Sequence, residues 1–333
     1  MKEFLPVIKY FCFSLQTFIV CIFPCKMNVN KELSNNINIT ITFYFQFMIG
    51  VSGNVILLLF HIVVFVVGHR PRLTDLPIGL LALNHLMTML TTGFITGDIF
   101  TSQGGFWNDI TCKSVIYLNR SMRGLSMCIT CHLSVLQAIT LSPRSSCLAK
   151  LKHESSCHSL CSLLFFWLLY ISISSHLFIS ITASTNLTSE NILYVSKSCS
   201  LLPMNYLLWH IVFTLLTIRD MFFIGIVSLS GGYIVILLWR HKKQSQHLHR
   251  NKVSPKASPE QRATWTILLL MCLFVVMTSL DIMSHSRIVL NNNPVIYCIQ
   301  IFVVHGYATV SPLVFITTEK RIINILRLMC GRK

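Results

Sequence analysis

Two arginines, Arg120 and Arg123, stand inside a mostly apolar stretch that begins at Cys112. Because they are three residues apart, their side chains project from one broad face of a helix. A charged side chain at membrane depth costs at least ~2.5–3.5 kcal/mol unless it faces a protein interior or a watery cavity. Guanidinium groups there would recognise an anionic or strongly accepting group on a small apolar body. The pair therefore predicts a ligand pocket lined by arginine.

The predicted ligand pocket also includes Asn119 and Asp281. With Cys112 as the outer end of its helix, Arg120 lies ~12 Å and Arg123 ~16 Å along the axis. Asp281 is eighteen positions after Ala263 on a later apolar segment, which places it in the same outer third. In the alternative interpretation, one of the two arginines pairs with Asp281 and only holds the helices together. The spacing leaves both interpretations open.

The remaining reactive side chains form no catalytic or metal-binding set. Cys128 and Cys131 make a CxxC pattern inside the apolar stretch, where free cysteine behaves as a small hydrophobe. A zinc site would need water and further ligands nearby, and the cluster of Cys157, His158 and Cys161 meets the same objection. The ionisable residues in apolar segments are too scattered to converge on one substrate. We therefore expect no enzyme activity, no metal and no cofactor.

The composition indicates a membrane protein. Hydrophobic residues make up 53% of the 333 residues and charged residues 11%, whereas a soluble domain carries about 25% charged residues. The net charge of +16 comes from basic residues grouped in short segments between long apolar runs. That grouping is typical of loops facing the cytoplasm, and it leaves no domain to carry nucleic-acid binding.

The apolar runs predict an all-α protein with seven membrane-spanning helices, since about 20 apolar residues cross a bilayer. The predicted spans are 41–67, 76–100, the stretch that begins at Cys112, 159–182, a fifth ending before Arg240, 258–281 and 294–317. The apolar stretch over residues 206–239 is too long for one crossing of the membrane. Counting back from Arg240 places Arg219 and Asp220 near the outer boundary, so the residues before them form either an outer loop or a projecting helix.

Three regions follow from these spans. Residues 1–40 form an extracellular N-terminal region, 41–317 the membrane domain, and 318–333 a cytoplasmic tail with a short amphipathic helix. Within residues 1–26, the run 5–25 is apolar but contains Lys9 and two prolines. They fit a signal-like segment, a signal-anchor, or an extension upstream of a start at Met27, and the sequence leaves these alternatives open.

The distribution of basic residues predicts the orientation. Seventeen lysines and arginines fall in the three inner links and the tail, against five on the other side. The positive-inside rule then places the C-terminus in the cytoplasm and the N-terminus outside, at the plasma membrane. The glycosylation sequons at Asn38 and Asn186, and the cysteines Cys112 and Cys199, all fall on the outer side.

Three segments of the chain read LQAITLSPRSSCLAKLKH, SPKASPEQRATWTILLLM and HGYATVSPLVF. They closely resemble the vomeronasal type-1 receptors, which are G-protein-coupled receptors for chemical signals. The resemblance implies a rhodopsin-like bundle of seven helices and a pheromone receptor of sensory neurons that acts through an inhibitory-class heterotrimeric G protein. It also implies a disulfide between Cys112 and Cys199, as in rhodopsin-like receptors. His85 stands where those receptors normally have an acidic sodium-binding residue, and this departure puts sodium regulation in doubt.

The basic inner links are expected to meet the G protein. The candidate residues are Arg144, Lys242, Lys243 and Arg262. The partners expected are therefore a small chemosignal, a heterotrimeric G protein and the lipid bilayer. A bitter-taste-type receptor is the nearest alternative. A polytopic transporter is the alternative from another class, although transporters often carry internal repeats and none is found here.

Overall fold

The computed structural model describes residues 29–66, 74–100, 107–143, 156–175, 177–183, 193–194, 198–201, 206–248, 264, 266–280, 294–319 and 322. The signal-like segment, residues 1–26, lies outside these ranges. So does nearly all of the predicted tail helix.

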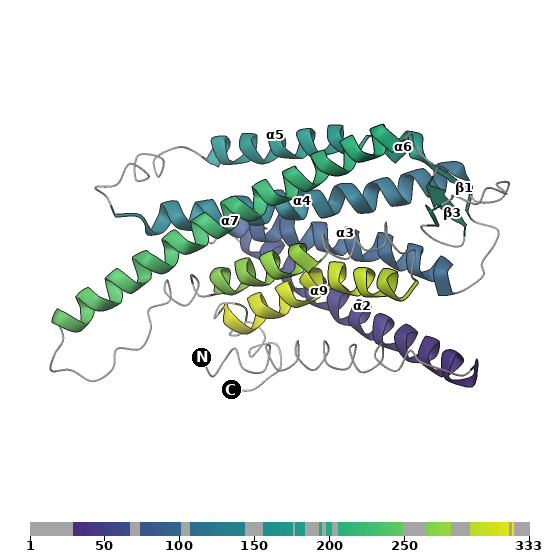
Figure 1. Cartoon of the computed structure of the whole chain (residues 1–333). Coiled ribbons are helices and arrows are strands. Elements are labelled where there is room, and N and C mark those ends of the chain that lie inside the picture. The colour runs from purple at the N-terminus through teal and green to yellow at the C-terminus, as the bar shows by residue number, and fades with distance from the viewer. Residues whose placement is uncertain are drawn as a thin grey trace.

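The described chain is a bundle of long helices with a small sheet at one end (Figure 1). The helices are α2 (Val29–Val66), α3 (Asp75–Phe100), α4 (Asp109–Leu141), α5 (Ser156–Ser174), the short α6 (Leu177–Ser180), α7 (Tyr206–Leu248), the helix Thr266–Leu280 and α9 (Pro294–Thr318). α4 packs against α3, α5 and α7, while α2 packs against α3 and α9. The stretch that carries the two arginines is therefore the central helix.

Four of the described helices are long and apolar enough to cross a membrane. Their spans are Thr40–Val66, Asp75–Asp98, Asp109–Leu141 and His210–Arg240. Two shorter apolar helices, Cys161–Ser172 and Thr266–Leu280, accompany them. Large hydrophobic side chains are exposed along these helices, as on Phe45 and Leu229, which is the arrangement a lipid environment stabilises. The all-α membrane architecture expected from the sequence is thus present.

The structure shortens one predicted helix and decides between the two alternatives left open for another. The helix predicted over 159–182 is too long, because α5 ends at Ser174 and residues 181–183 form a strand. Ser175 caps this end, since its backbone N–H and its hydroxyl both donate to the carbonyl of Ser172. α7 is one continuous helix from Tyr206, so the residues before Arg219 are helical and do not form a loop.

The sheet has the strand order β1-β3-β2 and is antiparallel throughout. Its strands are β1 (Ile181–Ala183), β2 (Leu193–Tyr194) and β3 (Cys199–Leu201). Strands of two or three residues are too short to show an alternating pattern, so the sequence did not indicate them.

Small and polar residues hold the helices close together. Pro312 of α9 lies against Gly53 of α2, where an added Cβ would come within 3.2 Å of the proline ring. The next residue, Asn54, is fully buried and donates its amide to the carbonyl of Ala308 at 2.9 Å. A glycine beside an amide thus provides both close packing and a hydrogen bond between helices, as such pairs do in membrane proteins.

Candidate functional site

A cavity of about 90 Å³ lies among six helices: α3, α4, α5, α7, Thr266–Leu280 and α9. Its charged lining residues are Arg120, Arg123, Arg219 and Asp220. The other polar ones are His85, Thr88, Ser126, Tyr170, Thr278 and Tyr307, and the apolar ones are Met127, Phe274, Met277 and Ala308. A few hydrogen-bonding groups on a partly apolar wall are the usual make-up of a small-molecule site.

The structure brings Arg120 and Arg123 to the wall of this cavity from one face of α4. Both side chains are half-buried. Their projection from a common face follows from the spacing of three residues, as the sequence indicated. Asp281 lies outside the described residues, so whether it pairs with an arginine stays a prediction.

Asn119 occupies a different position from the two arginines. Its amide donates to the hydroxyls of Thr91 and Thr92 on α3, at 3.0 and 2.8 Å. Thr92 also hydrogen-bonds to the imidazole of His305 on α9. Asn119 thus joins three helices through this network, and it is not among the residues that line the cavity.

Arg219 and Asp220 join the cavity although the sequence analysis placed them near the outer boundary of the fifth span. Asp220 Oδ1 accepts hydrogen bonds from Arg219 Nε at 2.9 Å and from Nη2 at 2.7 Å. The guanidinium carbon lies 4.2 Å from the centre of the Tyr170 ring, a cation–π contact between α7 and α5. The sequence did contain a signal for this pair, since Arg219 and Asp220 are adjacent, opposite charges inside an apolar run. Ionisable residues at membrane depth mark functional sites by default.

His85 connects the cavity to the proline-containing helix α9. It is 2% exposed, and its Nδ1 lies 3.0 Å from the hydroxyl of Ser311, the residue before Pro312. Its ring also packs edge-on against Tyr307 at 5.3 Å between centroids, and the Tyr307 hydroxyl hydrogen-bonds to Thr130 on α4. The residue at the expected sodium position therefore bridges α3 and α9 through an imidazole.

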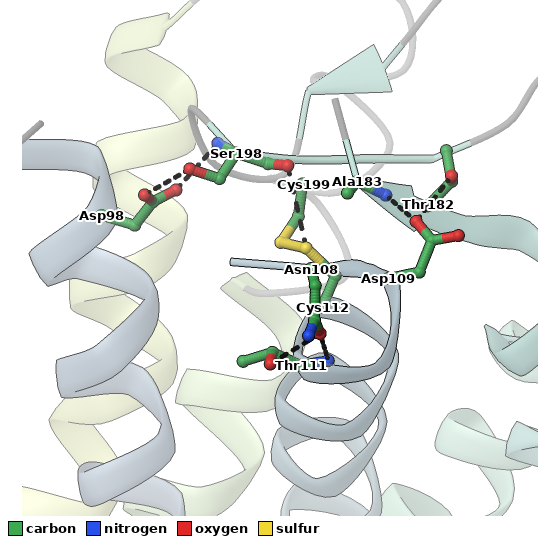
Figure 2. Close-up of a disulfide and its surroundings, with 9 residues drawn as sticks. All are labelled: Asp98, Asn108, Asp109, Thr111, Cys112, Thr182, Ala183, Ser198 and Cys199. Carbon is green, nitrogen blue, oxygen red and sulfur yellow. Dashed lines mark hydrogen bonds between the residues drawn. A yellow bond between two sulfur atoms is a disulfide. The ribbon is translucent and has the colours of Figure 1, made fainter. Parts of the chain in front are cut away.

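The end of the bundle that carries the sheet is tied to it by one covalent bond and two carboxylates (Figure 2). Cys112 and Cys199 form a disulfide with a Cα–Cα distance of 5.7 Å, the pairing that the resemblance implies. Asp98 on α3 accepts hydrogen bonds from the backbone N–H and the hydroxyl of Ser198, at 2.9 and 2.6 Å. Asp109 on α4 accepts from the backbone N–H of Ala183 at 2.6 Å and from the hydroxyl of Thr182.

The remaining predicted site residues are only partly described. Asn38 lies in α2, and Lys242 lies near the end of α7. Lys243 is exposed, with its Nζ 5.4 Å from the ring centre of Trp239. The sequon residue Asn186 and the inner-link residues Arg144 and Arg262 lie outside the described residues. Within the described part of the chain, no three His, Cys, Asp or Glu residues are grouped to hold a metal ion.

The chain is similar to known proteins over most of its length. Residues 37–328 match the family described as "Vomeronasal organ pheromone receptor family". Vomeronasal type-1 receptor A11 of Mus musculus is 56% identical over 307 residues, covering 92% of this chain and 96% of that protein. Vomeronasal type-1 receptor 48 of Mus musculus is 58% identical, covering 90% and 100%. Vomeronasal type-1 receptor 94 of Rattus norvegicus is 55% identical, covering 93% and 95%.

The family match covers most of the chain, and the resemblance read from three short segments is confirmed. These relatives are signalling receptors and not enzymes. With its apolar helices and its disulfide, the chain belongs to the vomeronasal organ pheromone receptor family, whose members are G-protein-coupled receptors with seven membrane helices.

Proposed function

We propose that this receptor binds a small chemosignal in the cavity between its helices and activates an inhibitory-class heterotrimeric G protein. The observation that carries the ligand site is the cavity wall, where Arg120, Arg123 and Arg219 converge from α4 and α7. Among the described lining residues there are three guanidinium groups and one carboxylate, which favours a ligand with an anionic or strongly accepting group. Phe274 and Met277 supply apolar surface for the body of the ligand.

The G protein is proposed to bind at the opposite, basic end of the helices. Lys242 and Lys243 extend α7 beyond its apolar span, which ends at Arg240. The excess of basic residues in the inner links supports a cytoplasmic C-terminus and an extracellular N-terminus. The resemblance to the family supports the inhibitory class of G protein.

The test is reporter signalling in cells that express the receptor together with an inhibitory-class or a stimulatory-class G protein. Cells are exposed to fractionated animal secretions, and an active fraction is then titrated on variants. Arg120→Gln and Arg123→Gln should each lower the potency about tenfold to a hundredfold, the equivalent of a lost hydrogen bond to a charged group. Lys113→Gln is the control, because Lys113 lies on the same helix, α4, and is not among the described residues that line the cavity.

Surface expression is measured for every variant. Normal surface levels with unchanged potency in both Arg120→Gln and Arg123→Gln would contradict the ligand site. Loss of surface expression in either variant would instead favour the interpretation that the arginine pairs within the bundle. Signalling through the stimulatory-class protein alone would contradict the proposed G protein class.

A further inference from the structure

We infer that the ligand is a short branched carboxylate and that Met277 and Gly306 set the limit on its size. Met277 lines the cavity from the helix Thr266–Leu280, and Gly306 of α9 lies against the end of its side chain. The inference rests on the proposed function, because it concerns the same cavity. It goes further by naming the class of ligand and the two residues that select it by size.

The charged lining of the cavity favours a carboxylate as the anionic group. Arg120 and Arg123 reach the cavity from one face of α4, and both line it. A guanidinium presents its N–H donors in a planar fork, which matches the two oxygens of a carboxylate. A carboxylate is also smaller than a phosphate or sulfate group, which matters in a cavity of about 90 Å³.

The volume of the cavity limits the apolar body of the ligand. At about 90 Å³ it is smaller than the ~150 Å³ of an engineered apolar cavity that holds one benzene ring. The enclosed part of the ligand is therefore smaller than a six-membered ring. A branched chain of about four carbons meets this limit, and 3-methylbutanoate carries such a chain on a carboxylate.

The apolar wall of the cavity has one rigid and one adaptable side chain on the same helix. Phe274 and Met277 are three residues apart, so they line the cavity from one face. The Phe274 ring packs edge-on against Tyr307 at 5.5 Å between centroids, and the Tyr307 hydroxyl hydrogen-bonds to Thr130. Methionine is unbranched and adapts to the space around it. The position of the Met277 side chain therefore depends on what lies against it.

Glycine at position 306 leaves room for the end of the Met277 side chain. A Cβ added to Gly306 would lie 2.9 Å from Met277 Cε, whereas carbon atoms pack best at about 3.5–4.0 Å. Met277 is 5% exposed, and its other sides are closely packed, so the cavity is the space into which it can move. A side chain at position 306 would thus push the methionine into the cavity. Gly306 is a positioning residue for Met277.

The experiment measures binding to the purified full-length receptor in lipid nanodiscs, from the rise in melting temperature as each probe is titrated. Propanoate, 3-methylbutanoate and cyclohexanecarboxylate differ in the size of the apolar body, and 3-methylbutanamide lacks the charge. In the wild type, 3-methylbutanoate at saturation should raise the melting temperature by ~2–4 °C. Cyclohexanecarboxylate and the amide should each bind about tenfold more weakly than 3-methylbutanoate.

Two variants should change the size limit in opposite directions. Gly306→Ala should weaken 3-methylbutanoate about tenfold relative to propanoate, the effect of one methyl group in an apolar pocket. Met277→Ala enlarges the cavity and should strengthen cyclohexanecarboxylate about tenfold relative to 3-methylbutanoate. When Met277→Ala is already present, Gly306→Ala should leave both ratios unchanged, because the side chain that it displaces is gone.

Gly50→Ala is the matched control. A Cβ added to Gly50 would lie 2.7 Å from Cε of Met89, so this change also displaces the end of a buried methionine. Neither Gly50 nor Met89 is among the described residues that line the cavity. The ratios between the probes should therefore equal those of the wild type.

The inference is overturned if 3-methylbutanoate causes no shift in the wild type, or if the amide or cyclohexanecarboxylate binds as tightly. It is also overturned if Met277→Ala leaves the ratios unchanged, or if Gly306→Ala changes them no more than Gly50→Ala does. A change of the same size in the presence and absence of Met277 would show that Gly306 does not act through Met277. A response to the active secretion fraction that still depends on Arg120 and Arg123 would keep the proposed function in each of these cases.

Discussion

At the scale of single residues, glycine decides how close two helices can come. Gly124 lies where the Tyr170 ring of α5 meets α4, and the ring occupies the space that any side chain there would need. Gly232 on α7 has no atom within 4 Å of the position a Cβ would take. Two glycines inside membrane helices thus have opposite surroundings, and only the first is required by packing.

Gly124→Ala should therefore destabilise the receptor by ~1–3 kcal/mol, the usual cost of adding a methyl group to a filled site. Gly232→Ala should be neutral or stabilising, because alanine is a better helix former than glycine by ~1 kcal/mol. Both are read as melting temperatures of the receptor in nanodiscs. Equal melting temperatures for the two variants would show that Tyr170 can move aside at no cost.

At the scale of elements, the outer sheet is held by contacts of unequal burial. Asp98 is 3% exposed and receives two hydrogen bonds from Ser198, next to the disulfide at Cys199. Asp109 is exposed, so water can replace it as an acceptor for Ala183. Asp98 is thus the stronger of the two restraints on the sheet, since its contact with Ser198 is part-buried, whereas the contact of Asp109 with Ala183 of β1 is exposed.

Asp98→Ala should loosen β3 more than Asp109→Ala does. Losing a buried acceptor that serves two donors corresponds to ~1.5–3 kcal/mol. The amides of β2 and β3 should then exchange hydrogen about tenfold to a hundredfold faster. Hydrogen exchange followed by mass spectrometry measures this rate. An increase of the same size in both variants would mean that burial does not set the strength of these contacts.

At the scale of the whole molecule, the basic residues are unevenly distributed along the chain. Most of them fall in the links and the tail that the sequence predicts to be cytoplasmic. A one-sided positive field speeds the approach of a negatively charged partner surface and fixes the orientation in the membrane. The two effects are separable, because orientation depends on the total number of charges and partner binding on particular ones.

Changing Lys242, Lys243 and Arg262 together to glutamine should lower signalling to an active secretion fraction about tenfold, through weaker electrostatic attraction of the G protein. The surface level should stay normal, since the other inner charges still fix the orientation. The control is a matched triple variant on the predicted outer side, in which Lys26, Lys31 and Lys113 are changed to glutamine. Unchanged signalling in the inner variant would leave these charges with an anchoring role alone.

The sequence by itself determined the membrane class, the apolar spans, the shared face of Arg120 and Arg123, and the family. Each of these depends on local spacing or on hydropathy along the chain, which a linear pattern records directly. The serines and β-branched residues just before Ser175 indicate the end of a helix. Apolar residues continue beyond Ser175, however, so the predicted helix was too long.

Only the tertiary structure decided which polar residues meet in the cavity. Arg219 became a cavity residue because α7 packs on α4 and brings it over Tyr170 of α5. Asn119 is adjacent to Arg120 in the chain, but its amide donates hydrogen bonds to threonines of α3. The strands of the outer sheet formed because a disulfide and two carboxylates hold segments too short to pair by their own propensity. These outcomes depend on which helix faces which, and that is set by contacts between residues far apart in the chain.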